Sequence, residues 1–249
     1  QLLLKWHFNE NPIDFAKLQL SKWKGNHMIR KICKIFGAIA ILFATSNAYS
    51  QDGFAVGLSG SLIDIEASGK ETLRTTSVVD STGAADNTTA IGSVFAEYTW
   101  NNITLGVDYI PGEADISNSV KQRDDTDFQD GDTTAGTAVS NKAQATIEDH
   151  YGVYLSYPLY ASFYGKIGFV QADIITSENL GTGSSYGDDT LDGYMFGFGV
   201  KSDLANNMFI KSEFFVTDYD DIKLTSDGSN IVEGDIDVKG ITLAVGYQF

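Results

Sequence analysis

The chain has 249 residues, of which 33 are Asp or Glu and 17 are Lys or Arg, so its formal net charge at pH 7 is −16. This acidic balance argues against nucleic acid as a partner, because nucleic acid is itself a polyanion. A single cysteine excludes a disulfide scaffold and a thiolate zinc cluster. The sequence has no run of about 18 apolar residues, so it predicts no transmembrane helix.

The first fifty residues are interpreted as two segments outside the fold. Residues 28–50 have a basic start, a short apolar stretch and small residues before an expected cleavage after Ala48 or Ser50. This order is typical of a secretory signal peptide. Residues 1–27 precede the first methionine, and we interpret them as read-through of upstream sequence, with an amphipathic helix as the alternative. The folded domain is then expected over residues 51–249.

From residue 51 onward, apolar residues alternate with small or polar ones. A period of two is typical of β-strands that have two chemically different faces. The alternation predicts eight strands, near residues 54–66, 90–100, 102–116, 144–157, 161–177, 190–202, 207–224 and 234–249. It is clearest in the last strand, where one face consists of Ile241, Leu243, Val245, Tyr247 and Phe249.

The predicted connections alternate in length along the chain. Tight turns are expected at residues 101–102, 158–160 and 203–206, and long polar loops at 67–89, 118–143, 178–189 and 225–233. Short turns at one end and long loops at the other are typical of an up-and-down barrel that crosses an outer membrane. The predicted fold is therefore all-β, an eight-stranded antiparallel up-and-down transmembrane β-barrel. Its strands supply the roughly 9–11 residues that each crossing needs.

The two strand faces differ in chemistry. The small or polar face carries the six residues of a predicted lumen charge network: Glu97, Asp108, Lys166, Lys201, Lys211 and Glu213. Three acids and three bases neutralise one another inside a narrow lumen. The apolar face ends, near the short turns, in a predicted aromatic girdle of Trp100, Tyr157, Tyr247 and Phe249. A soluble barrel with an apolar interior is the alternative, and this assignment of the faces argues against it.

Three segments resemble the small outer-membrane barrels of the OmpA/OmpX type. The C-terminal ITLAVGYQF, with Val245, Tyr247 and Phe249, resembles the signal that the barrel-assembly machinery reads. Residues 209–221 (FIKSEFFVTDYDD) and 159–169 (LYASFYGKIGF) resemble the seventh and fifth strands of that family. The resemblance implies an exported, monomeric protein in the outer membrane of a Gram-negative bacterium. Its implied partners are outer-membrane lipid, lipopolysaccharide and, during insertion, the assembly machinery.

The predicted domain contains one histidine, His150, which follows Asp149. Successive side chains of a strand point in opposite directions, so these two residues do not form a dyad, and no serine adjoins His150. We therefore expect His150 to lie at the surface or the rim of the barrel. The sequence also has no phosphate-binding loop, nucleophile elbow or metal-binding histidine pair, so we expect no catalytic residue, cofactor or metal centre.

Aspartates are concentrated in the predicted long loops. Residues 123–132 hold five of them, and Asp188, Asp189, Asp218, Asp220 and Asp221 are expected at the same end of the barrel. Oxygen clusters attract hard divalent cations, so weak calcium or magnesium binding at these acidic loops is one interpretation. The spacing does not match an EF-hand. A solvated acidic surface that keeps the protein soluble outside the membrane is the interpretation we favour.

The leading hypothesis for function is a non-enzymatic, integral outer-membrane protein with a structural and surface role in envelope integrity. The alternative is a narrow porin-like channel for ions or small solutes. An eight-stranded barrel is just wide enough for side chains to fill its interior. The lumen charges then form either a structural salt-bridge network or the lining of a narrow conductance.

Overall fold

A computed structural model describes residues 52–249, apart from 74–76, 127–137, 181–184 and 227–229. The predicted signal peptide and the segment before it lie outside the described residues, so both remain predictions.

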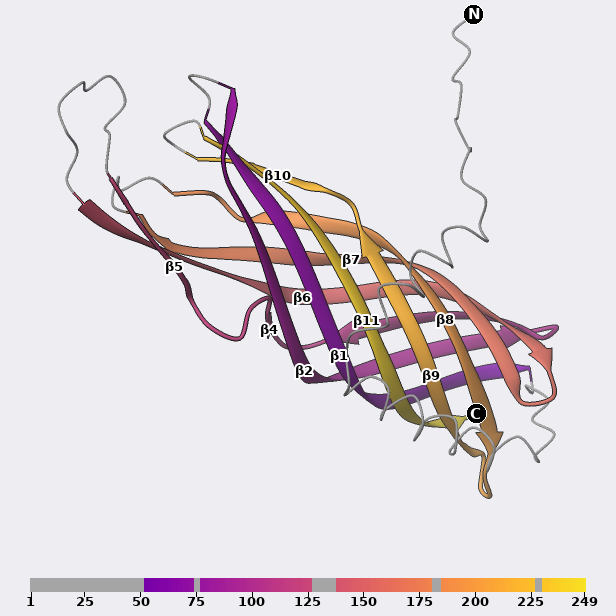
Figure 1. The fold of residues 1–249 in the computed structure, drawn as a ribbon. Coiled ribbons are helices and arrows are strands. Elements are labelled where there is room, and N and C mark those ends of the chain that lie inside the picture. The colour runs from indigo at the N-terminus through magenta and orange to yellow at the C-terminus, as the bar shows by residue number, and fades with distance from the viewer. Residues whose placement is uncertain (1–51, 74–76, 127–137, 181–184, 227–229) are drawn as a thin grey trace, which may run out of the picture. The chain divides into compact units, whose positions relative to one another are not determined.

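Eight strands form a closed antiparallel ring (Figure 1). They are β1 (Gly53–Leu73), β2 (Val78–Trp100), β3 (Ile103–Ile110), β6 (Ala138–Tyr160), β7 (Phe163–Asn179), β8 (Asp189–Asp203), β9 (Met208–Tyr219) and β11 (Ile231–Gln248). Each strand pairs with the next one in this series, and β11 pairs with β1 to close the ring. The predicted eight-stranded up-and-down barrel is confirmed.

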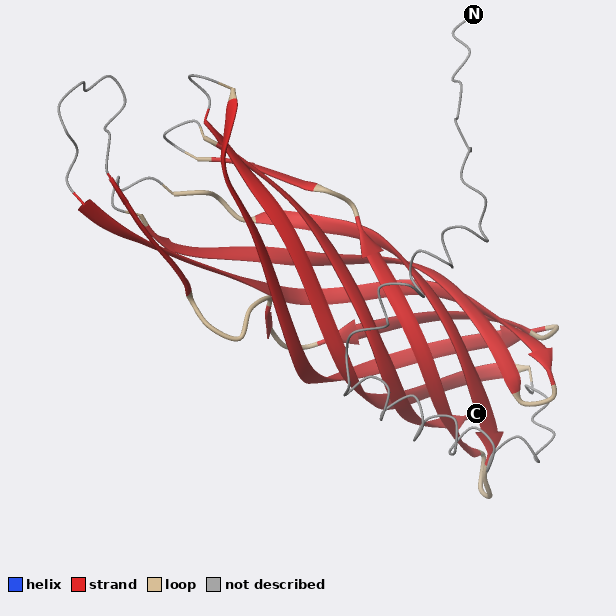
Figure 2. Cartoon of the chain, viewed as in Figure 1, coloured by secondary structure: helices blue, strands red, loops and turns tan. Residues whose placement is uncertain are grey.

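Three short strands lie outside the ring. β4 (Ala114–Asp115) and β5 (Lys121–Thr126) pair with β6, and β10 (Ile222–Thr225) pairs with β11. Together with the far ends of β1, β2, β6 and β11 they extend the sheet at the end opposite the short turns (Figure 2). We call this end the outer end of the barrel.

The predicted long loop over residues 67–89 is wrong. β1 and β2 continue through it as one hairpin, paired from Gly53↔Thr99 to Leu73↔Val78. β5 and the start of β6 likewise occupy part of the predicted loop at 118–143. Beyond the membrane the outward face of these segments meets water, so it need not be apolar. They therefore lack the alternation from which a strand is recognised.

β3 is shorter than the predicted 102–116. It ends at Ile110 because Pro111 has no N–H to donate to a neighbouring strand, and Gly112 N then donates to Ile110 O at 3.0 Å. The ladder between β2 and β3 stops at Val94↔Tyr109. Farther out, Asn87 Nδ2 donates to Asp115 O at 2.6 Å. The barrel wall therefore has a break between β2 and the segment that follows β3.

The tight turns lie close to where they were predicted. Asn101 and Asn102 have φ values of 49° and 67°, which asparagine tolerates and a two-residue hairpin requires. The next turn is centred on Ala161 and Ser162 rather than on 158–160, because β6 continues to Tyr160.

The outer surface of the ring is apolar. Along β3, Ile103, Leu105, Val107 and Tyr109 are exposed, whereas Thr104 and Gly106 between them are buried. On β1 the exposed apolar positions run from Phe54 to Leu62, a stretch whose length suits one tilted membrane crossing of roughly 9–11 residues. Immediately beyond this band Lys239 binds Asp64 and Glu66. No helix in the described part of the chain is long and apolar enough to cross a membrane.

Candidate functional site

Aromatic rings inside the barrel lie on glycines of the neighbouring strand. Tyr154 of β6 is directly opposite Gly106 of β3, and a Cβ atom added to that glycine would lie 2.2 Å from Tyr154 Cζ. The same relation holds for Phe95 with Gly57 and for Phe209 with Gly246, again at 2.2 Å. The glycines of the inward face therefore make room for large rings inside a narrow barrel.

The first of two ion pairs in the lumen joins β9 to β2. Lys211 Nζ binds Glu97 Oε1, and both side chains are nearly inaccessible, with 12% and 6% of their surface exposed. Tyr154 Oη donates a second hydrogen bond to the same carboxylate oxygen at 2.7 Å. Lys211 Nζ also lies 4.3 Å from the centroid of the Phe95 ring. The buried carboxylate is thus neutralised and hydrogen-bonded from two sides.

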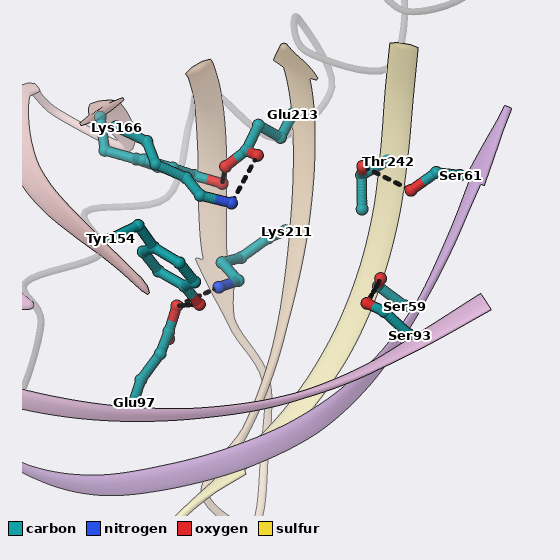
Figure 3. Close-up of polar contacts among 10 residues, drawn as sticks. Ser59, Ser61, Ser93, Glu97, Tyr154, Lys166, Lys211, Glu213 and Thr242 are labelled. Atoms are coloured by element: carbon teal, nitrogen blue, oxygen red, sulfur yellow. Dashed lines mark hydrogen bonds and ion pairs between the residues drawn. The ribbon is translucent and has the colours of Figure 1, made fainter. Parts of the chain in front are cut away.

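The second ion pair joins β7 to β9. Lys166 Nζ lies 3.0 Å from Glu213 Oε1, and Tyr164 Oη donates to Glu213 Oε2 at 2.9 Å. Lys166 Nζ also lies 4.1 Å from the centroid of the Tyr154 ring, which connects the second pair to the first. Figure 3 shows the two pairs side by side across the lumen. We call these two ion pairs, with Tyr154, Tyr164 and Phe95, the ionic layer.

The structure brings together four of the six predicted lumen charges, namely Glu97, Lys166, Lys211 and Glu213. Lys201 belongs to neither ion pair; its Nζ atom lies 4.4 Å from the centroid of the Phe209 ring, which Lys211 Nζ also approaches at 5.7 Å. Asp108 points inward, but its Oδ1 atom is buried without a hydrogen-bond partner. The sequence reasoning missed Tyr154 and Tyr164, although both lie at inward positions of the alternation and their hydroxyls complete the layer.

A cavity of about 100 Å³ adjoins the ionic layer on the side of the outer end. Its lining includes Lys166, Lys211 and Glu213 of the layer. One wall is hydroxylic, with Ser59 hydrogen-bonded to Ser93 and Ser61 to Thr242, each at 2.7 Å (Figure 3). The other lining is mainly apolar and includes Ile63, Ile91, Met195, Phe215 and Val238.

Farther toward the outer end the interior is packed with apolar side chains. Ile65, Val170, Ile174 and Leu191 are at most 2% exposed and belong to one continuous cluster. The lumen is therefore filled by two different kinds of packing, ionic near the short turns and apolar near the outer end, with the cavity between them.

The prediction that His150 lies at the surface or rim is wrong. The ladder between β6 and β7 shifts register between Glu148 and Tyr151, and Asp149 has a φ of 46°. This β-bulge inserts an extra residue and so re-aims the following side chain. His150 consequently lines the cavity, with its ring centroid 6.4 Å from that of Tyr219.

The four residues of the predicted girdle lie on the outer surface at the short-turn end. Trp100, Tyr157, Tyr247 and Phe249 are 66%, 55%, 42% and 70% exposed. Phe249 N donates to Phe54 O at 2.8 Å, so the last residue is tied to the first strand. Val245 is also exposed on this face. The roles of these residues at the membrane interface and in assembly remain predictions.

The predicted acidic clusters are only partly described. Asp127, Asp130 and Asp132 lie outside the described residues. Asp218 lies with Asp235 and Asp237, and one carboxylate oxygen from each of the three lies within 4.8 Å of the others. Such groups of exposed acids are common without a bound ion, so cation binding remains a prediction.

Glu71, near the outer end of β1, accepts hydrogen bonds from four segments of the outer end that are far apart in the sequence. Its Oε2 atom accepts hydrogen bonds from Ser81 and from Arg123 of β5, both at 3.3 Å. Its Oε1 atom accepts from Tyr186 Oη at 3.0 Å and from Asn230 at 3.1 Å. Burial and the charge of Glu71 raise the pKa of Tyr186, which therefore remains a donor at neutral pH.

Replacing Glu71 with Ala should loosen the outer end of the barrel. The four donors would lose their common acceptor, so the amide hydrogens of β5 and β10 should exchange faster, while those of β3 and β8 should keep their rates. Hydrogen exchange followed by mass spectrometry checks this. Unchanged exchange in β5 and β10 would show that Glu71 does not hold these connections.

Glu233 provides the matched control on the same extension. Glu233 is bound to Lys70 at 2.7 Å and to Lys223 at 3.5 Å. The hydrogen bond and the charge of Lys70 lower the pKa of the Glu233 carboxyl. The stabilisation from this lowered pKa is present above the unfolded-state pKa and is lost as the pH falls through the folded-state pKa. Because these groups are exposed, Glu233→Ala should change exchange only locally.

Comparison with known proteins identifies the family. The sequence profile described as the outer membrane protein beta-barrel domain matches residues 36–249. The chain belongs to this family. No curated protein matches the chain. The family assignment agrees with the closed ring and with the apolar outer surface. The apolar band on that surface is therefore the part of an outer-membrane barrel that faces lipid.

Solved structures of other outer-membrane proteins are similar to this chain. OprG of Pseudomonas aeruginosa matches with a TM-score of 0.50 and 11% identity, over 82% of this chain and 99% of that one. The protease OmpT of Escherichia coli matches with 0.47 and 13%, over 83% and 100%. Neisserial surface protein A matches with 0.39 and 13%, over 79% and 97%. At these identities the likeness to OprG shows the fold alone.

Proposed function

We propose that this protein is a non-enzymatic, integral outer-membrane barrel with a structural and surface role, and that its lumen is closed to ions and solutes. The ionic layer is the observation that supports a closed lumen. Two ion pairs and the rings that contact them come from β2, β6, β7 and β9, which lie around the ring. In an eight-stranded barrel such side chains are enough to fill the interior.

Opening the lumen would require the ion pairs to separate. Glu97 and Glu213 are each held by a lysine and a tyrosine, and all four polar partners are largely buried. Removing one partner of a buried pair typically costs about 3–5 kcal/mol, because a buried charge is left unpaired. Passage of a solute would require this free energy to separate an ion pair. The solute would then have to displace the apolar cluster around Ile65 and Leu191.

The non-enzymatic assignment rests on the surroundings of the histidine. His150 Nδ1 is buried without a hydrogen-bond partner among the described residues, so none of them holds the imidazole through this nitrogen, as the orienting residue of a general base does. The similarity to OmpT is too low to bring a protease activity to this chain.

The surface supports residence in the outer membrane of a Gram-negative bacterium. The apolar band faces lipid, and the girdle residues suit the interface at the short-turn end. The extended strands of the outer end then stand beyond the lipopolysaccharide leaflet. Phe249, Tyr247 and Val245 are proposed to form the signal for the assembly machinery, and the barrel is proposed to act as a monomer.

Planar-bilayer recording of the refolded protein tests the closed lumen. We expect no steady openings, because neither ion pair separates without leaving a buried charge. Steady single-channel openings of the unaltered protein would contradict the proposal and would favour the alternative of a narrow channel. A variant with Lys166→Gly and Lys211→Gly provides the comparison, because it empties the ionic layer of both lysines and should conduct more than the unaltered protein.

A further inference from the structure

The cavity beside the ionic layer has an excess of negative charge. Both lysines that line it are already paired, Lys166 with Glu213 and Lys211 with Glu97. Two further carboxylates line it, those of Asp108 and Glu113, and neither forms an ion pair with any residue that the structure describes. A cation inside the cavity would therefore meet carboxylates that form no ion pair with the described residues, rather than compete for those of the ionic layer.

Two polar atoms at one side of the cavity lack partners. Asp108 Oδ1 and His150 Nδ1 are buried, and each is without a hydrogen-bond partner. They come from neighbouring strands, since Asp108 is paired with Gly152 of β6, and Ile110 with His150. A buried polar atom without a partner costs free energy, and a ligand that donates hydrogen bonds would recover it. The donor is best charged, because Asp108 is a carboxylate.

The rest of the cavity suits a short apolar group. Ile91, Met195, Phe215 and Val238 contribute to its lining. Its volume of about 100 Å³ is smaller than the ~150 Å³ of an apolar cavity that admits benzene. The apolar part of an occupant is therefore limited to a short alkyl chain.

The cavity reaches the protein surface at the break in the barrel wall. Gly112 and Glu113 line it and are themselves exposed. They follow Pro111, where β3 has left the ladder with β2. An occupant would therefore enter past the carboxylate of Glu113, which attracts cations.

We propose that this cavity binds a small primary alkylammonium ion. The ammonium group donates to the carboxylate of Asp108, which turns from its present position against Gly152 toward the cavity, and the alkyl chain lies against Met195 and Phe215. This binding goes beyond the structural role proposed above and does not require solute to cross the ionic layer. A closed lumen and an occupied cavity are compatible, so the conductance experiment and the binding experiment succeed or fail independently.

The methionines of the chain allow a direct test with n-butylammonium as the probe. The sequence has three, Met28, Met195 and Met208, and of the two described, Met195 lines the cavity while Met208 is exposed on the outer surface. The protein is labelled at the methionine methyl carbons, refolded in detergent micelles and titrated with the probe. The chemical shift of the Met195 methyl group should change with n-butylammonium concentration and reach a plateau. The chemical shift of the Met208 methyl group should stay unchanged.

Charge selectivity is measured with n-butanol and butyrate, which match the probe in length. Each should bind at least about tenfold more weakly than n-butylammonium, the difference expected for loss of a hydrogen bond between charged groups. Equal affinity for n-butanol would overturn the proposal, because it would indicate nonspecific apolar binding. Absence of a saturating Met195 shift, or equal shifts at Met195 and Met208, would overturn it as well.

The variant Asp108→Asn removes the negative charge and keeps the side-chain shape. It should weaken n-butylammonium binding by about tenfold or more, whereas Asp203→Asn, exposed at the short-turn end, should leave binding unchanged. Equal affinities of Asp108→Asn and the unaltered protein would contradict the assigned contact. Should Asp108→Asn fail to fold, the comparison of n-butylammonium with n-butanol on the unaltered protein still decides the proposal.

Discussion

Replacing Lys211 with Met should lower the free energy of unfolding by about 3–5 kcal/mol, because Glu97 would stay buried without its cation. The hydrogen bond from Tyr154 to Glu97 remains in this variant, but one neutral donor does not neutralise a buried carboxylate. Urea unfolding of the refolded protein in lipid vesicles, followed by the fluorescence of Trp100, measures the change.

The double variant Glu97→Gln with Lys211→Met is the informative control. It removes both charges together, so most of the lost stability should return. If the double variant is as unstable as Lys211→Met, packing of the lysine stem rather than the unpaired charge accounts for the loss. An exposed pair gives the second comparison: Lys70→Met, which breaks the Lys70–Glu233 contact, should have little effect.

Replacing Gly106 with Ala should destabilise the barrel by about 1–3 kcal/mol, the usual cost of overpacking a well-packed interior. The new methyl group would lie 2.2 Å from Tyr154 Cζ and 2.6 Å from its hydroxyl oxygen, so the ring has to move away from Glu97. A methyl group at Gly106 therefore disturbs the ionic layer indirectly, by displacing the Tyr154 hydroxyl from Glu97. Electrophoresis without heating, which separates folded from unfolded barrels, and urea unfolding check the result.

Gly60→Ala is the matched control for this substitution. Gly60 lies in a ring strand as Gly106 does, but a Cβ atom there would meet nothing within 4 Å. Alanine should be tolerated at Gly60 or should stabilise the strand slightly, because it reduces the freedom of the unfolded chain. Equal losses for Gly106→Ala and Gly60→Ala would mean that strand propensity, not contact with Tyr154, sets the effect.

The sequence predicted the ring because lipid imposes a strict pattern on it. Within the band, each outward residue of β3 and β11 is apolar and each inward one is small or polar, so strand number and direction follow from the alternation. Beyond the band the outward face meets water and need not be apolar, so the sequence predicts a loop over residues 67–89 where the structure has paired strands. Outward apolar residues at every second position identify the strand segments that lipid covers. They do not identify the strand segments that extend beyond the lipid.

The lumen was predictable in its charges but not in its contacts. Glu97, Lys166, Lys211 and Glu213 were recognised as inward from the period alone. Their pairing, and the contact of Tyr154 with Gly106, depends on the register between strands, which a period of two does not specify. His150 was misplaced for a related reason, because the bulge at Asp149 interrupts the alternation without any apolar signal.

Closure of the ring between β1 and β11 determines when the barrel can form. The pairing brings together Ser61 and Thr242, which are 181 positions apart, so it requires nearly the whole chain and is entropically among the most expensive contacts to make. Before β11 is available, β1 and β9 are both open edges with unpaired backbone groups. The barrel should therefore close late in folding, and a chain interrupted before β11 should associate with other chains through these two edges.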